Sequence, residues 1–145
     1  MILIYYHVAV FVSQGKTPFD ESILEDAGHF TRTVMAYKGI ECVEVCVRPD
    51  HVHLLLKVPA KADVFAAIET LQYWLQDFVA RKSSQPPFQW DQRLWLVSKS
   101  PADLSSVKRY FRRQEEYHLL KGIDAEWVDM LDMEEICEES LVIIG

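Results

Sequence analysis

The sequence predicts an α+β domain in which amphipathic helices pack on an antiparallel β-sheet. Runs rich in Val, Ile, Tyr and Phe occur four times, and two of them are separated only by the tight-turn tripeptide Arg48-Pro49-Asp50. The segments between the other runs place apolar residues three and four apart, which is typical of helices. A chain of 145 residues, half of them apolar, is also the size of one domain with its own core.

The expected elements follow one another in an order that indicates a specific topology. Strands are expected at residues 2–13, 40–47, 51–58 and 94–98. Helices are expected from about Asp20 to Gly39, then at about 62–82, 102–120 and 125–136. Pro101 and Asp103 suit the first turn of the third helix. The first six elements match the ferredoxin-like βαββαβ unit with its antiparallel sheet, and a long helix and a short acidic helical tail follow it.

Charge is distributed unevenly along the chain. The net charge is −7, but residues 124–145 contain eight acidic residues and no basic residue, so residues 1–123 carry +1. Residues 81–121 have nine basic residues against four acidic ones. We expect one domain over residues 1–145, with a core of about 1–120 and an acidic tail of about 124–145. The basic character needed to contact nucleic-acid phosphates is therefore local.

The sequence predicts a cytoplasmic protein. Its longest apolar run, residues 2–12, is interrupted by His7 and is much shorter than the roughly 20 residues of a membrane helix. The run also lacks the basic start and the cleavage site of a secretory signal. Cys42 and Cys46 would lie about 13 Å apart on one strand, too far for a disulfide, so we expect reduced thiols.

Two histidines in the third strand could hold a metal ion. Residues i and i+2 of a strand share a face, so His51 and His53 point the same way while Val52 and Leu54 point the other way. Paired imidazoles on a rigid strand can converge on one ion. Two solvated or capped histidines would have the same pattern, so the pair alone leaves both interpretations open.

The third helix adds two candidates to this pair. Its stripe at spacings of three, four and three consists of Val107, Tyr110, Gln114 and Tyr117. If this stripe covers the face that bears His51 and His53, Gln114 can supply a neutral oxygen ligand and Tyr110 can reach a phosphate beside the ion. A phenol is a poor nucleophile at neutral pH and a phosphodiester repels attack, so a divalent cation would assist the reaction.

Residues around the tyrosine have alternative roles. Arg109 and Arg113 flank it on a helical wheel and could contact phosphates, although a solvated basic face is the other interpretation. His118 could replace Gln114 as a ligand. Tyr117 could be a spare nucleophile, but packing is its favoured role.

Other histidines and aromatic residues have simpler interpretations. His7 and His29 are expected to be structural or solvated. Tyr73 and Trp74 could stack on bases, but core or interface packing is the favoured role for aromatic residues in an amphipathic helix.

Two motifs resemble those of a known family. The segment Arg48-Pro49-Asp50-His51-Val52-His53-Leu54-Leu55-Leu56 resembles the strand motif of HUH-type single-tyrosine transposases of small bacterial insertion sequences. Residues 107–118, VKRYFRRQEEYH, resemble the catalytic helix of that family, with the tyrosine four residues before the glutamine. REP-associated tyrosine transposases share these motifs. The resemblance covers roughly residues 1–120.

The resemblance implies a metal-dependent endonuclease and strand transferase that acts on single-stranded DNA through a 5′ phosphotyrosine. It makes Tyr110 the nucleophile and His51, His53 and Gln114 the ligands of Mg²⁺ or Mn²⁺. The implied partner is the hairpin end of a mobile element, so the protein would be associated with the nucleoid when bound to DNA. A homodimer is also implied, in which Tyr110 serves the histidines of its own chain or of the partner.

Two other functions remain open. The shortage of basic residues fits a domesticated, catalytically silent binder of structured DNA or RNA. A zinc hydrolase could instead use His51 and His53 with a bound water, and its activity would not depend on Tyr110.

Overall fold

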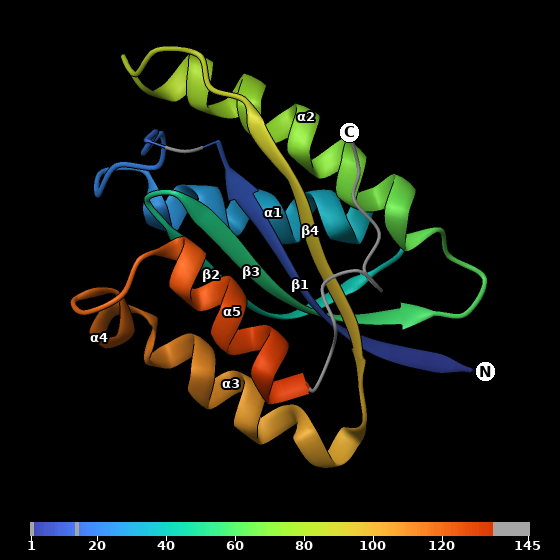
Figure 1. Cartoon of the computed structure of the whole chain (residues 1–145). Coiled ribbons are helices and arrows are strands. Elements are labelled where there is room, and N and C mark those ends of the chain that lie inside the picture. Colours follow the sequence, from blue (N-terminus) through green and yellow to red (C-terminus); the bar gives the residue numbers. More distant parts are fainter. Residues whose placement is uncertain (1, 14, 135–145) are drawn as a thin grey trace.

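A four-stranded antiparallel sheet lies between two layers of helices in the computed structural model, which describes residues 2–13 and 15–134 (Figure 1). The strands are β1 (Leu3–Val12), β2 (Glu41–Arg48), β3 (His51–Pro59) and β4 (Trp90–Lys99). Their order across the sheet is β2-β3-β1-β4. With α1 (Leu24–Tyr37) and α2 (Val64–Lys82) between them, this arrangement confirms the predicted ferredoxin-like core.

One face of the sheet carries the main apolar core. Val8 and Val10 of β1 point to the same side as Val52 and Leu54 of β3, because paired residues of neighbouring strands share a face. Helices α1 and α2 cover this side (Figure 1). Asp63 caps α2 by accepting a hydrogen bond from the Ala66 amide at 3.0 Å.

The ends of one helix and one strand differ from their predicted positions. Helix α1 begins at Leu24 rather than near Asp20, whose carboxylate accepts a hydrogen bond from the Ser22 amide at 3.0 Å and holds a turn. The helix is followed by Gly39 with φ +74°, as its sequence predicts. Strand β4 is longer than residues 94–98, because it pairs with β1 from Tyr5 to Val12.

The other face of the sheet is covered by the C-terminal helices. After a 3-10 turn, Pro101–Asp103, these helices are α3 (Leu104–Arg112), α4 (Gln114–His118) and α5 (Ile123–Glu134). The single helix expected at 102–120 is therefore divided at Arg113, whose amide lies 3.1 and 3.2 Å from the carbonyl oxygens of Arg109 and Tyr110. No proline or glycine explains the break. It coincides instead with the burial of the Gln114 side chain against the sheet.

Helix α5 packs on the sheet rather than projecting from it. Its residues Trp127, Met130 and Leu131 are buried against Phe11 and Trp95 of the strands. The remainder of the predicted acidic tail, residues 135–145, lies outside the described residues. Within the described part of the chain, no helix combines the length and apolar character needed to cross a membrane.

A bulge in β2 separates the two cysteines. The pairing with β3 shifts between Cys42 and Glu44, so Cys42 lies opposite Leu56 while Cys46 lies opposite His53. One inserted residue reverses the facing of the side chains that follow it. Both thiols are free, as predicted.

Candidate active site

Strand β3 positions the two predicted histidines on the face beneath α3, α4 and α5. The side chains of His51 and His53 are both fully buried. Nδ1 of His51 lies 2.7 Å from Oδ1 of Asp50, and Nδ1 of His53 lies 2.9 Å from Nε2 of His7 on β1. Each contact occupies one ring nitrogen, so both imidazoles present Nε2 to the same space. His7 is 5% exposed, which places it in a structural role beside His53.

Helices α3 and α4 bring the predicted tyrosine and glutamine to these histidines. Gln114, the first residue of α4, has its Oε1 atom 2.9 Å from Nε2 of His51. The ring of Tyr110 packs edge-on to His53, with 5.5 Å between the ring centroids. The break at Arg113 separates these two side chains along the helix but leaves both at the site.

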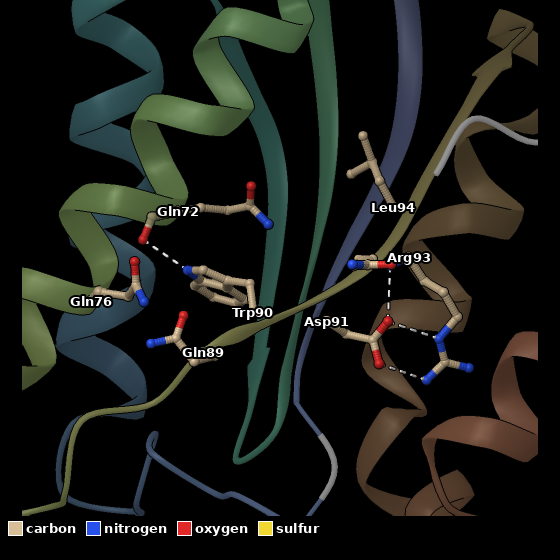
Figure 2. Close-up of a pocket in the computed structure, with 8 residues that line it drawn as sticks. Gln72, Gln76, Gln89, Trp90, Asp91, Arg93 and Leu94 are labelled. Carbon is tan, nitrogen blue, oxygen red and sulfur yellow. Dashed lines mark hydrogen bonds and ion pairs between the residues drawn. The ribbon is translucent and has the colours of Figure 1, made fainter. Parts of the chain in front are cut away.

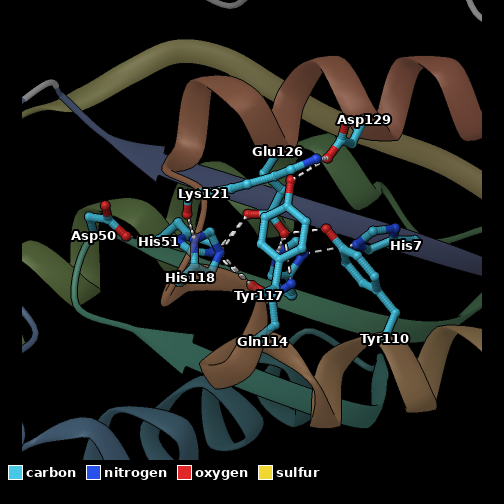
Figure 3. Close-up of polar contacts among 11 residues, drawn as sticks. His7, Asp50, His51, Tyr110, Gln114, Tyr117, His118, Lys121, Glu126 and Asp129 are labelled. Carbon is cyan, nitrogen blue, oxygen red and sulfur yellow. Dashed lines mark hydrogen bonds and ion pairs between the residues drawn. The ribbon is translucent and has the colours of Figure 1, made fainter.

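Helix α5 supplies a residue that the sequence analysis did not single out. Glu126 is fully buried at the centre of the site, as Figure 3 shows. Its Oε1 atom lies 3.1 Å from Nε2 of His51, and its Oε2 atom lies 3.0 Å from Nε2 of His53. Oε2 also accepts hydrogen bonds from the hydroxyl of Tyr110 and, at 2.7 Å, from the Gln114 amide. Glu126 therefore contacts all four residues predicted to form the site.

The sequence did contain a signal for this glutamate. The apolar stripe of α5 recurs at Ile123, Trp127, Met130 and Leu131. Glu126 lies within that stripe, three residues after Ile123. A carboxylate on the buried face of an amphipathic helix needs a partner inside the protein.

His118 also lies at the site. Its Nε2 atom is 3.0 Å from Oε1 of Glu126 and 3.0 Å from Oε1 of Gln114. Its Nδ1 atom lies 2.8 Å from the carbonyl oxygen of Lys121, which fixes the ring. The structure therefore places both Gln114 and the alternative ligand His118 at the site.

The spacing of these donor atoms fits a divalent cation. One ligand atom from each of His51, His118 and Glu126 lies within 4.8 Å of the others. Neighbouring ligands of an octahedral ion at about 2.1 Å are about 3.0 Å apart. The four separations given above between an imidazole Nε2 atom and Oε1 of Glu126 or Gln114 are close to that value, at 2.9 to 3.1 Å. These residues could therefore hold a metal ion.

Charges at the site are strongly coupled. Burial lowers the pKa of His51, but its hydrogen bonds to the carboxylates of Asp50 and Glu126 outweigh burial and raise the pKa to about 9. Burial raises the pKa of Glu126, but hydrogen bonds with His118, His51 and His53 outweigh burial and hold the pKa well below its ordinary value. Without a metal ion, His51 is therefore cationic and Glu126 is anionic at neutral pH.

Burial shifts the pKa of Tyr110 and of the two inner histidines, His7 and His53, toward their neutral forms. Burial, followed by the negative charge of Glu126, raises the pKa of the Tyr110 phenol well above its ordinary value. Burial lowers the pKa of both His7 and His53, so these rings are neutral. The phenol of Tyr110 is thus protonated and hydrogen-bonded to the carboxylate of Glu126 in the metal-free protein.

Several predicted candidates lie away from this centre. Arg109 and Arg113 are exposed. The hydroxyl of Tyr117 donates to Oδ2 of Asp129 at 2.6 Å rather than pointing at the histidines. The side chain of His29 is 73% exposed, and Tyr73 is 71% exposed.

A hollow lies between β4 and α2 (Figure 2). Trp90 closes it by donating from Nε1 to the Gln72 carbonyl oxygen at 2.9 Å. Asp91 and Arg93 pair at its rim at 3.1 Å. None of the residues that surround Glu126 lines this hollow, so it is separate from the candidate active site.

Comparisons with known proteins place this chain in a family. The sequence profile described as "Transposase IS200 like" matches residues 1–114. No functionally curated protein has a significant sequence match to the chain. The fold is similar to that of a candidate transposase from Deinococcus radiodurans R1, with a TM-score of 0.63 and 18% identity over 79% of this chain and 92% of that one.

A second solved structure is similar to the same degree. It is described as a REP-associated tyrosine transposase bound to a REP hairpin, with a TM-score of 0.64 and 14% identity over 79% of this chain and 68% of that one. At these identities the two structures support the fold. The family match covers most of the chain and includes His51, His53, Tyr110 and Gln114. The chain therefore belongs to the family of IS200-like transposases.

Proposed function

We propose that this protein cuts and rejoins single-stranded DNA, with Tyr110 as the nucleophile. The observation that carries the proposal is the position of the Tyr110 hydroxyl, which meets the carboxylate that also contacts His51 and His53. In a member of the transposase family, a half-buried phenol at paired histidines is suited to attack a phosphodiester. The free hydroxyl of the cut strand can later reverse the step, so strand transfer follows as well as cleavage.

Each residue of the proposed site has a separate role in the reaction. The oxygen of Tyr110 forms a bond to phosphorus, the bond from phosphorus to the 3′ oxygen breaks, and a 5′ phosphotyrosine results. The phenol proton leaves along the hydrogen bond to Glu126 and passes to water, and the 3′ oxygen takes up a proton from water, so the step releases no net proton. His51, His53 and Gln114 are the proposed ligands of Mg²⁺ or Mn²⁺. When bound, such an ion polarises the phosphorus and neutralises charge on the phosphate oxygens.

The proposed approach of DNA to Tyr110 is through a hollow beside its side chain. A hollow of about 210 Å³ borders Tyr110 and His7 and includes Lys99. The exposed Arg109 and Arg113 lie on the neighbouring turns of the chain and are the proposed phosphate contacts. A hairpin DNA end is the proposed substrate, because the fold is shared with a transposase bound to a REP hairpin.

The proposed assembly is a homodimer that acts on DNA in the nucleoid. We propose that Tyr110 serves the histidines of its own chain, and its hydrogen bond to Glu126 of the same chain supports this. Dimerisation would then organise two DNA ends rather than complete either site. Sedimentation of the protein with and without hairpin DNA tests this arrangement.

Trapping of the covalent intermediate tests the proposed chemistry. The protein is incubated with Mn²⁺ and 3′-labelled single-stranded hairpins taken from the DNA that flanks its gene. We expect a labelled protein band on a denaturing gel for the wild type and for Tyr117→Phe, but none for Tyr110→Phe. An adduct that persists in Tyr110→Phe would contradict the assignment of the nucleophile.

A silent DNA-binding protein is the second candidate. The observation that favours it is the raised pKa of Tyr110, because a protonated phenol bonded to Glu126 is poorly prepared for attack. This alternative predicts retarded but uncut hairpins in the same experiment. Hydrolysis that continues in Tyr110→Phe and stops after removal of zinc would instead indicate the hydrolase.

A further inference from the structure

We propose that Arg48, the last residue of β2, binds a phosphate of the DNA strand beside the one that Tyr110 attacks. The site is a hollow of about 220 Å³ between the turn that precedes β3 and the start of α5. The inference rests on the proposed function in one respect, namely that a DNA strand reaches Tyr110. The residues that line the hollow are Arg48, Pro49, Asp50, His118, Lys121 and Gly122.

Strand pairing places Arg48 on the face of the sheet that carries the candidate active site. Arg48 lies directly opposite His51 in the antiparallel pair of β2 and β3. Directly paired residues of neighbouring strands point to the same side of the sheet, so the guanidinium lies on the same face as the His51 imidazole. The bulge between Cys42 and Glu44 helps to set this facing, because an inserted residue reverses the side chains that follow it.

The guanidinium of Arg48 has an unsatisfied donor. The side chain is half-buried, and its Nε atom is buried without a hydrogen-bond partner among residues 2–13 and 15–134. The Asp50 carboxylate, two residues further on, pairs with Nδ1 of His51 at 2.7 Å instead. An unpaired buried donor on a cation is costly, so the group that binds there should be an anion with acceptor oxygens. Phosphate fits this description, because a guanidinium can bind two of its oxygens at once.

Other groups in the lining also favour an anion. Lys121 supplies a second cation, and because its side chain is 50% exposed it can turn from Asp129, 2.9 Å away, toward a phosphate. Gly122 precedes the first residue of α5, so the positive end of the dipole of that helix borders the hollow. The hydrogen bond to His51 offsets the negative charge of the Asp50 carboxylate.

The hollow adjoins the candidate active site without including its tyrosine. His118 lines the hollow, and its Nε2 atom lies 3.0 Å from Oε1 of Glu126. The separate hollow beside Tyr110 borders His7, and in Figure 3 His7 and Asp50 lie at opposite ends of the polar network, with Glu126 between them. A strand that enters beside Tyr110 and continues past His118 therefore reaches the hollow. The two ends of the site can then hold the strand on both sides of the reacting phosphate.

Hairpins that carry one uncharged phosphate at a time test the proposal. Hairpins with single-stranded flanks are taken from the DNA beside the gene and labelled, and fluorescence anisotropy measures their affinity in EDTA, which suppresses cleavage. In each hairpin a different flank phosphate is replaced by methylphosphonate. The matched variants are Arg48→Gln and Arg81→Gln, which removes the same charge from an exposed position on α2.

We expect the wild type and Arg81→Gln to lose at least about fivefold in affinity at one phosphate other than the cut one. Arg48→Gln should bind the unmodified hairpin at least about fivefold more weakly and should show no further loss at that position. Its slope of log affinity against log salt should be smaller by about 0.7, the value for one phosphate contact on a single strand. The proposal is overturned by a wild-type pattern of losses in Arg48→Gln, or by the absence of such a position in the wild type.

Two further measurements complete the test. Lys121→Gln alters an exposed side chain and should fold even if Arg48→Gln does not, and its loss at the same phosphate should be smaller than in the wild type. An undiminished loss there would contradict the proposed pair of cations.

Inorganic phosphate distinguishes the sources of the anion. If it raised the melting temperature of the wild type but not of Arg48→Gln, while both bound hairpins equally, the hollow would bind free phosphate and the DNA contact would be wrong. The adduct experiment examines Tyr110 separately. A protein that binds DNA through Arg48 but forms no adduct would contradict the proposed chemistry and leave the phosphate contact standing.

Discussion

The two faces of the sheet differ in what they bury. On the side of α1 and α2, strands β1 and β3 present a continuous set of Val and Leu side chains. On the opposite side the same strands present His7, His51 and His53, covered by Gln114 and Glu126. Alternation along a strand thus allows one ten-residue segment to contribute both to the apolar core and to a polar site. Apolar packing holds the first face, whereas the second face combines the packing of Trp127 on Phe11 and Trp95 with buried hydrogen bonds among charged groups.

The largest effect that we expect comes from the apolar face. Leu54 is fully buried there, so Leu54→Ala should reduce the free energy of unfolding by about 3 kcal/mol through lost contacts and a cavity. Urea denaturation measures this change. The fractional occupancy of the site by Mn²⁺ should be unchanged in the folded variant, because Leu54 points away from His51 and His53. Loss of ion binding in the folded Leu54→Ala protein would show that the two faces are not independent.

The polar face should make stability depend on pH in the absence of metal. The pKa of His51 is raised to about 9 in the folded protein, so its contribution is fully present below pH 6.5 and is lost as the pH rises through 9. In EDTA, we expect the free energy of unfolding to fall by about 1–2 kcal/mol between pH 6.5 and 8.5. Burial lowers the pKa of His7 and of His53, so these residues reduce stability below that window, in acid.

Asp50→Asn is the matched variant for this pH dependence. The Asp50 carboxylate contributes to the raised pKa of His51, and Asp50 lies in the turn before β3 rather than in the core. We expect a shallower fall in stability between pH 6.5 and 8.5 in Asp50→Asn than in the wild type. An equally steep fall would mean that another group produces the pH dependence.

The smallest difference between the faces should be the reactivity of the two cysteines. Burial raises the pKa of Cys42 on the apolar face to about 12 and that of Cys46 on the polar face to about 11. At pH 7.5 roughly one thiol in a thousand or fewer is ionised at either position. Alkylation by iodoacetamide, followed by mass spectrometry, should be slow at both in the native protein and fast after denaturation. Rapid native labelling of Cys46 would indicate that the polar face opens to solvent.

The sequence predicts the fold better than it predicts the full site. The sheet follows from local patterns, such as alternation in the third strand and the turn at Pro49 and Asp50, and these patterns do not depend on the rest of the chain. The position of His51 and His53 follows from the same alternation. The motif spacing correctly indicates that Tyr110 and Gln114 approach those histidines.

The features that sequence reasoning missed depend on contacts between distant elements. The break at Arg113 has no local signal, because the buried contacts of Gln114 accompany it rather than a proline or glycine. The net charge summed over residues 124–145 assigns Glu126 to the acidic tail. Its position in the apolar stripe of α5 becomes informative only when that stripe is known to cover the sheet face that bears the histidines.

The late position of Glu126 in the chain has a consequence for synthesis. The last strand of the sheet ends at Lys99, so the sheet can form while α5 is still within the ribosome. A nascent chain, or one shortened by a stop codon before Ile123, would still have His51 and His53. It would leave Phe11 and Trp95 uncovered, and it would lack the Glu126 carboxylate that contacts both histidines. The site can therefore be completed only after translation has passed Glu126, which follows the last strand of the sheet by more than one helix.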